Sequence, residues 1–204
     1  MKAALRLYLV ADRGFPSRVP FLEAIDAAVQ GGVTLVQIRD KGADARAFLR
    51  EAIAVRELLK GRNVKLIVND RIDVALAAGA DGVHLGQSDL PPSLARKMLG
   101  PRAIIGLSIG NGAQLDDREC DAAHYLGVGP VLATSTKSDA APPIGLDGLK
   151  AICATAKIPV GGIDAKNAAA VMASGVDGVC VVSAILGTAD PRAAAAALAK
   201  AMAA

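Results

Sequence analysis

The chain has 204 residues, of which 52% are hydrophobic and 2% are aromatic, with a formal net charge of +3. This length predicts one domain. The scarcity of aromatic rings argues against nucleic acid, because single-strand and RNA binders stack bases on such rings. The mild positive charge favours a small anionic ligand. No apolar run approaches the ~20 residues of a membrane span, so no membrane partner is expected.

The cysteines and the N-terminal segment bear on where the protein works. Cys120, Cys153 and Cys180 form no CxxC pair, which is typical of reduced thiols in a cytoplasmic protein. The apolar run 5–11 is followed at once by Asp12 and Arg13, so it is too short for a signal peptide. We therefore expect a cytoplasmic location.

Eight short apolar runs are spaced along the chain. They cover residues 5–11, 33–39, 64–69, 82–86, 103–108, 124–129, 157–163 and 178–182. Most are almost continuously apolar and do not alternate with polar residues, which is typical of strands covered on both faces in a parallel sheet.

Helical patterns lie between these runs. In residues 45–60, Phe48, Ala52, Val55 and Leu59 recur at helical spacing and predict a face that packs on the sheet. Pro91-Pro92 and Pro191 fall where helices could begin. Strand and helix alternating eight times is the order of an α/β (β/α)8 TIM barrel with parallel strands, and we predict one such domain over residues 1–204. A doubly wound sheet is the alternative, but its glycine-rich fingerprint is missing after the first strand.

In a barrel of this kind the functional groups lie at the carboxyl ends of the strands. Gln37, Arg39 and Lys41 alternate at the second strand end and so tend to share a side, although an exposed strand end with one salt bridge would explain them as well. Asp70 and Asp89 would suit Mg²⁺, which takes one or two carboxylates plus substrate phosphate oxygens. Capping of the helices that follow them is the alternative.

Two loops have the composition of phosphate sites. Thr134, Ser135, Thr136 and Lys137 offer three hydroxyls and an ammonium after the sixth strand, where an ST-turn is the alternative. Gly162, with the amides of Val182 and Ser183, would form a second site after strands seven and eight. A tight turn would also explain that glycine.

The two histidines lie within predicted strands. His84 stands between Val83 and Leu85, and His124 begins the sixth run. We interpret both as hydrogen-bonded barrel residues and not as catalytic bases.

Several blocks of the sequence closely resemble the thiamine phosphate synthase family. They are "VQIRDK", "VNDRIDVALAAGADGVHLGQSDLP", "GLS", "YLGVGPVLATSTK" and "GVDGVCVVSAI". The similarity runs from Tyr8 to Pro191. One difference is the seventh strand, where "IPVGGI" (158–163) is shorter than the family pattern.

The resemblance implies a condensation of hydroxymethylpyrimidine diphosphate with thiazole ethyl phosphate, giving thiamine phosphate and pyrophosphate. It implies Mg²⁺ as cofactor, two small-molecule substrates as partners, and no particular oligomeric state. The implied pyrimidine diphosphate ligands are Gln37, Arg39, Lys41, Asn69, Ser108 and Lys137. The implied thiazole phosphate ligands are Thr134, Ser135, Thr136, Gly162, Val182 and Ser183. Asp70 and Asp89 would bind the metal, and Arg39, Lys41 and Lys137 would act in catalysis.

Two other functions remain open at this point. A thiazole tautomerase of the same fold carries a histidine in the loop after strand six, where this chain has Pro130. A non-catalytic barrel that binds a phosphorylated ligand would have no need of a metal-assisted leaving group.

Overall fold

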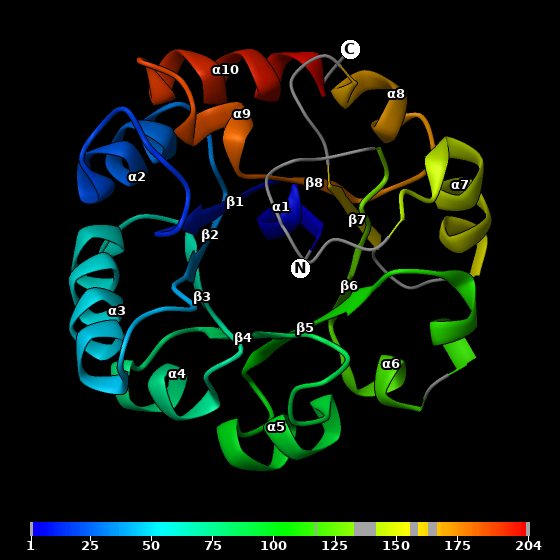
Figure 1. Ribbon diagram of the computed structural model, residues 1–204, viewed down its shortest axis with the longest axis horizontal. Helices are drawn as coiled ribbons and strands as arrows, with labels where there is room; N and C mark the ends of the chain where they lie inside the picture. The colour runs from blue at the N-terminus through cyan, green and yellow to red at the C-terminus, as the bar shows by residue number, and fades with distance from the viewer. Residues whose placement is uncertain (1, 117, 133–141, 156–158, 163–166, 203–204) are drawn as a thin grey trace.

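The computed structural model describes residues 2–116, 118–132, 142–155, 159–162 and 167–202. Eight parallel strands close a barrel in chain order, which confirms the predicted fold (Figure 1). The strands are β1 (Leu7–Asp12), β2 (Leu35–Arg39), β3 (Lys65–Asn69), β4 (Gly82–Leu85), β5 (Ile104–Ile109), β6 (Tyr125–Val128), β7 (Pro159–Gly162) and β8 (Gly178–Val181).

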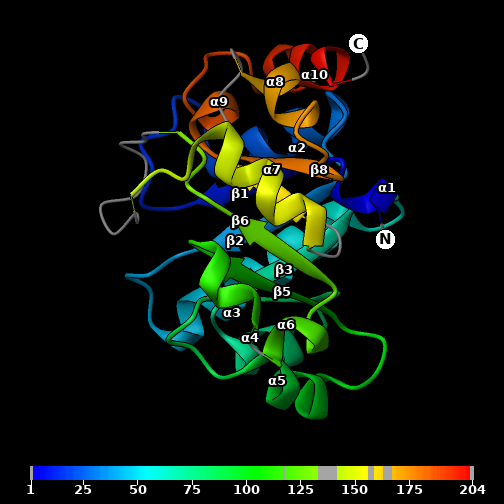
Figure 2. The same cartoon turned by 90° about the vertical axis from the view of Figure 1, so that its right-hand side faces the viewer.

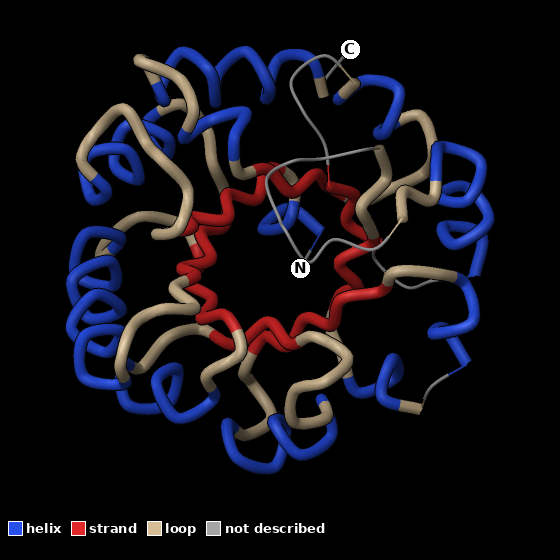
Figure 3. The backbone as a smooth tube through the Cα atoms, in the orientation of Figure 1, coloured by secondary structure: helices blue, strands red, loops and turns tan. Residues whose placement is uncertain are grey.

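Helices surround the strands as an outer ring (Figure 3). They are α2 (Phe21–Gln30), α3 (Ala45–Leu59), α4 (Ile72–Ala78), α5 (Pro92–Leu99), α6 (Glu119–Ala122), α7 (Gly145–Thr155), α8 (Ala168–Met172), α9 (Ser183–Leu186) and α10 (Pro191–Ala201), with a 3₁₀ turn η1 (Gly112–Asp116). The short α1 (Lys2–Leu5) is not part of this ring and lies across the end of the barrel where the strands begin (Figures 1 and 2). In the described part of the chain, no helix has both the length and the apolar character needed to cross a bilayer.

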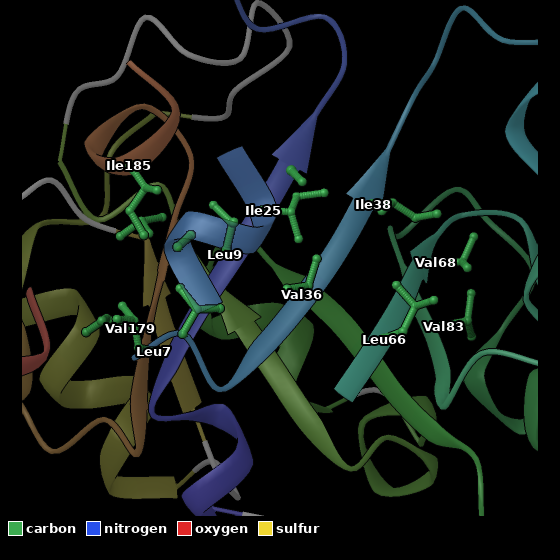
Figure 4. Packing of buried hydrophobic residues seen from close by; sticks show 14 of the residues in the cluster. Leu7, Leu9, Ile25, Val36, Ile38, Leu66, Val68, Val83, Val179 and Ile185 are labelled. Atoms are coloured by element: carbon green, nitrogen blue, oxygen red, sulfur yellow. The ribbon is translucent and has the colours of Figure 1, made fainter. Parts of the chain in front are cut away.

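Each strand has an outer and an inner face, because alternate residues point to opposite sides. The outer residues, such as Leu7, Leu9 and Val36, pack against the helices in the larger hydrophobic cluster (Figure 4). The inner residues form a separate, smaller cluster that includes Tyr8, Leu35, Ile67 and Tyr125. Burial on both faces accounts for the continuous apolar runs in the sequence.

The helical predictions are confirmed where they were most specific. All four residues of the α3 stripe, Phe48, Ala52, Val55 and Leu59, are buried. Asp44 caps this helix by accepting a hydrogen bond from the Ala47 amide, a role that suits its short carboxylate. Helix α5 has Pro92 as its first residue and α10 begins at Pro191, where a missing N–H costs nothing.

The short seventh strand still completes the barrel. β7 has four residues, as β4, β6 and β8 do. Val160 pairs with Gly127 on one side and with Gly178 on the other. The compressed "IPVGGI" segment therefore does not open the sheet, and the prediction for this strand is confirmed over Pro159–Gly162.

Candidate active site

The predicted polar residues of β2 and β5 point into the barrel near its carboxyl end, which we call the rim. Gln37 and Arg39 alternate with Val36 and Ile38, which belong to the outer cluster. Ser108 likewise alternates with the outer residues Leu107 and Ile109. The parallel register places Arg39 beside Asp12, the last residue of β1.

Asp70 holds an unusual backbone conformation at the end of β3. Its φ is 61°, the only positive value for a residue other than glycine in the described part of the chain. The strain costs on the order of 1–3 kcal/mol, and such strain is often found at functional sites. The Asp70 amide donates to the carbonyl of His84 at 2.9 Å, which fixes the turn. The alternative of helix capping is wrong here, because the cap of α4 is Arg71.

Asp89 lies in the turn that follows β4. Its Oδ2 accepts a hydrogen bond from the Gly86 amide at 2.7 Å, and its own amide contacts the Gly86 carbonyl at 3.3 Å. The cap of α5 is Pro91, with no side-chain cap, so the capping alternative is wrong for Asp89 too. Both carboxylates are therefore held by loops at the rim.

The two acids face each other. Burial, followed by the charge of Asp89 and a hydrogen bond between the two carboxyls, raises the pKa of Asp70 to about 6. The charges of Lys41 and Arg39 act in the opposite direction and lower this pKa. Asp89, Lys41 and Arg39 are therefore all close enough to Asp70 to influence its charge.

This acidic pair fits a hard divalent cation. Two carboxylates repel each other when both are ionised, and a bound cation removes that repulsion. Mg²⁺ typically uses one or two carboxylates and completes its shell with water and phosphate oxygens. Asp70 and Asp89 match that requirement, and no group of three or more acidic, histidine or cysteine ligands occurs in the described ranges.

Arg39 is held by an acid that the sequence analysis missed. Its Nη1 forms an ion pair with Oδ2 of Asp12, and the two side chains are only 13% and 5% exposed. Asp12 also accepts a hydrogen bond from the Gly14 amide at 2.9 Å. The single salt bridge expected for an ordinary strand end is thus present, but it is buried and it orients the guanidinium. Asp12 is the last residue of β1, so a search of the carboxyl ends of all eight strands would have found it.

Ser108 and His84 contact each other inside the barrel. His84 Nε2 lies 2.9 Å from Ser108 Oγ, and its Nδ1 lies 3.0 Å from the hydroxyl of Tyr125. His124 is bonded through Nδ1 to Arg96 at 2.8 Å. The prediction is confirmed for His84, which is a hydrogen-bonded barrel residue. His124 is also hydrogen-bonded, but it lies one residue before β6 and contacts Arg96 of α5.

Gln37 is joined to a tyrosine that sequence reasoning also missed. Its Nε2 donates to the hydroxyl of Tyr8 at 2.6 Å. Tyr8 and Tyr125 are the two tyrosines of the chain, and each lies within a strand. Asn69 ends β3, and its carbonyl accepts from the Arg71 amide at 2.7 Å, which shapes the turn around Asp70.

The second predicted phosphate site is described in part. Gly162 ends β7 and pairs with Cys180 of β8. Val182 follows β8 and precedes α9, which begins at Ser183. The predicted Thr134, Ser135, Thr136 and Lys137 lie outside the described residues.

Together these features define a (β/α)8 barrel with an acidic pair and cationic side chains at one rim. The family model described as thiamine monophosphate synthase matches residues 7–185. A thiamine-phosphate synthase from Moorella thermoacetica is 48% identical over 93% of this chain and 91% of its own. One from Chloroflexus aurantiacus is 49% identical over 93% and 89%.

The solved structures agree. A thiamine phosphate pyrophosphorylase from Pyrococcus furiosus superposes with a TM-score of 0.87 at 36% identity, covering 99% of this chain and 97% of that one. The chain belongs to the thiamine monophosphate synthase family.

Proposed function

We propose that this enzyme condenses hydroxymethylpyrimidine diphosphate with thiazole ethyl phosphate, and that Mg²⁺ at Asp70 and Asp89 assists the reaction. The products are thiamine phosphate and pyrophosphate. One observation carries the proposal: family membership over nearly the whole chain coincides with an acidic pair flanked by Arg39 and Lys41.

The bonds that change define what the protein must do. The bond between the pyrimidine CH₂ and the diphosphate oxygen breaks, and its electron pair leaves with pyrophosphate. The exocyclic amine of the pyrimidine donates electrons toward the CH₂ and stabilises the cation. The thiazole nitrogen then forms the new C–N bond. No strong base is required, so we expect neither histidine of the chain to act as one.

Stabilising the leaving group is therefore the main task of the side chains. Arg39, Lys41 and Lys137 would bind the diphosphate and hold positive charge where negative charge develops. The buried Asp12 keeps Arg39 fixed, so little reorganisation is needed during the reaction. When bound, Mg²⁺ would supply further charge neutralisation at the same oxygens.

Substrate positioning is the second task. Gln37, Asn69 and Ser108 would hold the pyrimidine. The thiazole phosphate would lie against Thr134, Ser135, Thr136, Gly162, Val182 and Ser183. Bringing two reactants together in this way can remove several kcal/mol from the barrier.

The binding partners and the cellular location that we expect follow from the same chemistry. Both partners are small phosphorylated molecules, and we expect neither nucleic acid nor membrane to take part. No disulfide joins Cys120, Cys153 or Cys180 in the described part of the chain, which supports a reducing cytoplasmic location.

The test is the release of pyrophosphate from the two substrates with Mg²⁺ and with a chelator. We expect stoichiometric pyrophosphate and thiamine phosphate with Mg²⁺, and a rate lower by orders of magnitude without it. Aromatisation of the thiazole without pyrophosphate would instead indicate a tautomerase. Binding without turnover would indicate a phosphate-ligand binder. Either result would contradict the proposal.

A further inference from the structure

A chain of hydrogen bonds, which we call the interior relay, crosses the barrel beneath the rim; its first two bonds are buried and its last two are partly buried. Its members in order are Gln37, Tyr8, Tyr125, His84 and Ser108. The successive distances are 2.6, 2.8, 3.0 and 2.9 Å. Gln37 and both tyrosines are at most 3% exposed. The relay thus joins two residues expected to hold the pyrimidine through three that lie deeper.

Two glycines make room for the relay. A Cβ on Gly106 would lie 2.2 Å from the ring of Tyr125 and 2.4 Å from His84 Nδ1. A Cβ on Gly127 would lie 2.9 Å from the His84 ring. Glycine within a strand normally weakens it, and it often marks a close approach of other groups. At these two positions it leaves space for the stacked rings of His84 and Tyr125, whose centroids are 5.5 Å apart.

Both tyrosines stay protonated at any ordinary pH. Burial raises the pKa of Tyr8 well above its usual value, and the neighbouring Tyr125 raises it further. Burial likewise raises the pKa of Tyr125. Each phenol therefore contributes one proton, and the directions of the bonds can be counted.

The count gives the relay a polarity. Gln37 donates its amide N–H to Tyr8. The arrangement that uses both phenol protons within the relay then has Tyr8 donating to Tyr125, and Tyr125 donating to Nδ1 of a neutral His84. His84 then carries its proton on Nε2 and donates it to Ser108. The relay uses neither the amide oxygen of Gln37 nor the hydroxyl proton of Ser108.

We propose that the interior relay is a specificity device that presents Gln37 as an acceptor and Ser108 as a donor at the same time. This inference rests on the proposed function. An aminopyrimidine matches that polarity, since its amine donates and its ring nitrogens accept. Tyr8, Tyr125 and His84 are positioning residues that act through the two ends of the relay.

The same polarity selects against an oxopyrimidine. When a ring carbonyl replaces the amine, an acceptor stands where the donor was, and a ring N–H replaces an accepting nitrogen. Reversing the relay to suit that ring would require Gln37 to turn its amide and all three intermediate protons to move. A site built for one hydrogen-bond pattern rejects the other strongly, because buried groups are left unpaired.

The test is calorimetric binding of two probes in the presence of Mg²⁺: the aminopyrimidine monophosphate and its oxo analogue. We expect the wild-type protein to prefer the amino compound by about 100-fold. Tyr125→Phe breaks the relay at its centre and should reduce the preference by about tenfold. Tyr8→Phe frees only the Gln37 end and should have a smaller effect.

Thr34→Val is the matched control. The Thr34 hydroxyl bonds to the Leu7 amide at 3.0 Å and to its carbonyl at 3.1 Å, where the strands begin. Its loss removes a hydroxyl from the same barrel and should leave the preference unchanged, even if the protein melts at a lower temperature.

Two results would overturn the inference. One is a wild-type preference near unity, which needs no variant to measure. The other is an unchanged preference in Tyr125→Phe with a normal melting transition. Pyrophosphate release by the wild type is measured separately. If the relay inference is wrong, the binding preference fails while pyrophosphate is still released; if the proposed function is wrong, no pyrophosphate is released.

Discussion

Carboxylates occur at both ends of the barrel, but their surroundings differ. Where the strands begin, Asp81 accepts from the Lys65 ammonium at 2.8 Å and from the Leu66 amide at 2.9 Å. At the rim, which is the other end of the barrel, Asp70 faces Asp89. The pKa of Asp70 is raised there by burial and by the charge of Asp89. One acid is paired and the other is opposed by a like charge.

The different surroundings of Asp81 and Asp70 indicate that the first acid stabilises the fold and that the second serves the active site. A partly buried acid with a cation and an amide partner contributes to folding. An acid in a strained turn beside another acid lowers stability unless something else binds there. The unfavourable interaction between Asp70 and Asp89 thus lies at the rim, where a metal-bound diphosphate would relieve it.

The largest difference between the two ends is expected when one acid at each end, Asp70 or Asp81, is neutralised. Asp70→Asn should lower turnover by a factor of about 1,000, because metal binding supplies several kcal/mol of transition-state stabilisation. Its melting temperature should stay the same or rise, since repulsion from Asp89 is removed. Asp81→Asn should instead lower the free energy of unfolding by about 1–2 kcal/mol and keep turnover near normal. Steady-state kinetics and thermal melts check both, and equal effects of the two variants on turnover would contradict the distinction.

A second prediction concerns the buried ion pair at the rim. Arg39→Ala should lower kcat by a factor of about 100, as expected for loss of one preorganised donor. Asp12→Asn keeps the guanidinium but loosens it, so its effect on kcat should be about tenfold or less. A larger effect in Asp12→Asn than in Arg39→Ala would show that Arg39 does not act on the diphosphate.

The third prediction concerns the end of the barrel where the strands begin, and it adds a side chain to Gly82, the first residue of β4. A Cβ on Gly82 would lie 1.8 Å from the carbonyl oxygen of Ile104, whereas one on Gly112 meets nothing within 4 Å. Gly82→Ala should therefore lower the free energy of unfolding by about 3 kcal/mol, and Gly112→Ala should have little effect. Chemical denaturation measures both values. Turnover per folded molecule should be normal in Gly82→Ala, and a specific loss of turnover would link that end to catalysis.

The smallest expected effect is a pH dependence of the metal-free protein. Asp70 has a folded pKa of about 6, above its usual 3.8, so between these values the folded state binds more protons than the unfolded state. Stability should therefore fall as pH rises through this range. Melting temperatures in chelator should show this trend in the wild type and a flatter one in Asp70→Asn. Identical profiles for the two proteins would mean that Asp70 is not the group responsible.

The strands could be predicted from sequence because burial on both faces leaves a long apolar run. This signal located even β7, although "IPVGGI" is short. Arg39, Asp70 and Asp89 could be found because a parallel barrel gathers strand ends at one rim. The choice between metal binding and capping for Asp70 could not be made, since its positive φ is set by the turn and not by residue type.

The interior relay could not be predicted. Tyr8 and Tyr125 are separated by 117 positions, and only closure of the barrel brings their hydroxyls to 2.8 Å. Each lies in a predicted apolar run, 5–11 or 124–129, and so resembles a core residue. Asp12 escaped notice for a different reason: it ends an apolar run and was interpreted only as the end of that run.

A crystal structure with Mg²⁺ and pyrophosphate is the decisive test of the metal site proposed at Asp70 and Asp89. We predict one metal ion bound by both Asp70 and Asp89 at about 2.1 Å, sharing a pyrophosphate oxygen, with Arg39 and Lys41 on the same anion. Pyrophosphate bound away from the rim, or a metal ion that contacts neither aspartate, would contradict the account.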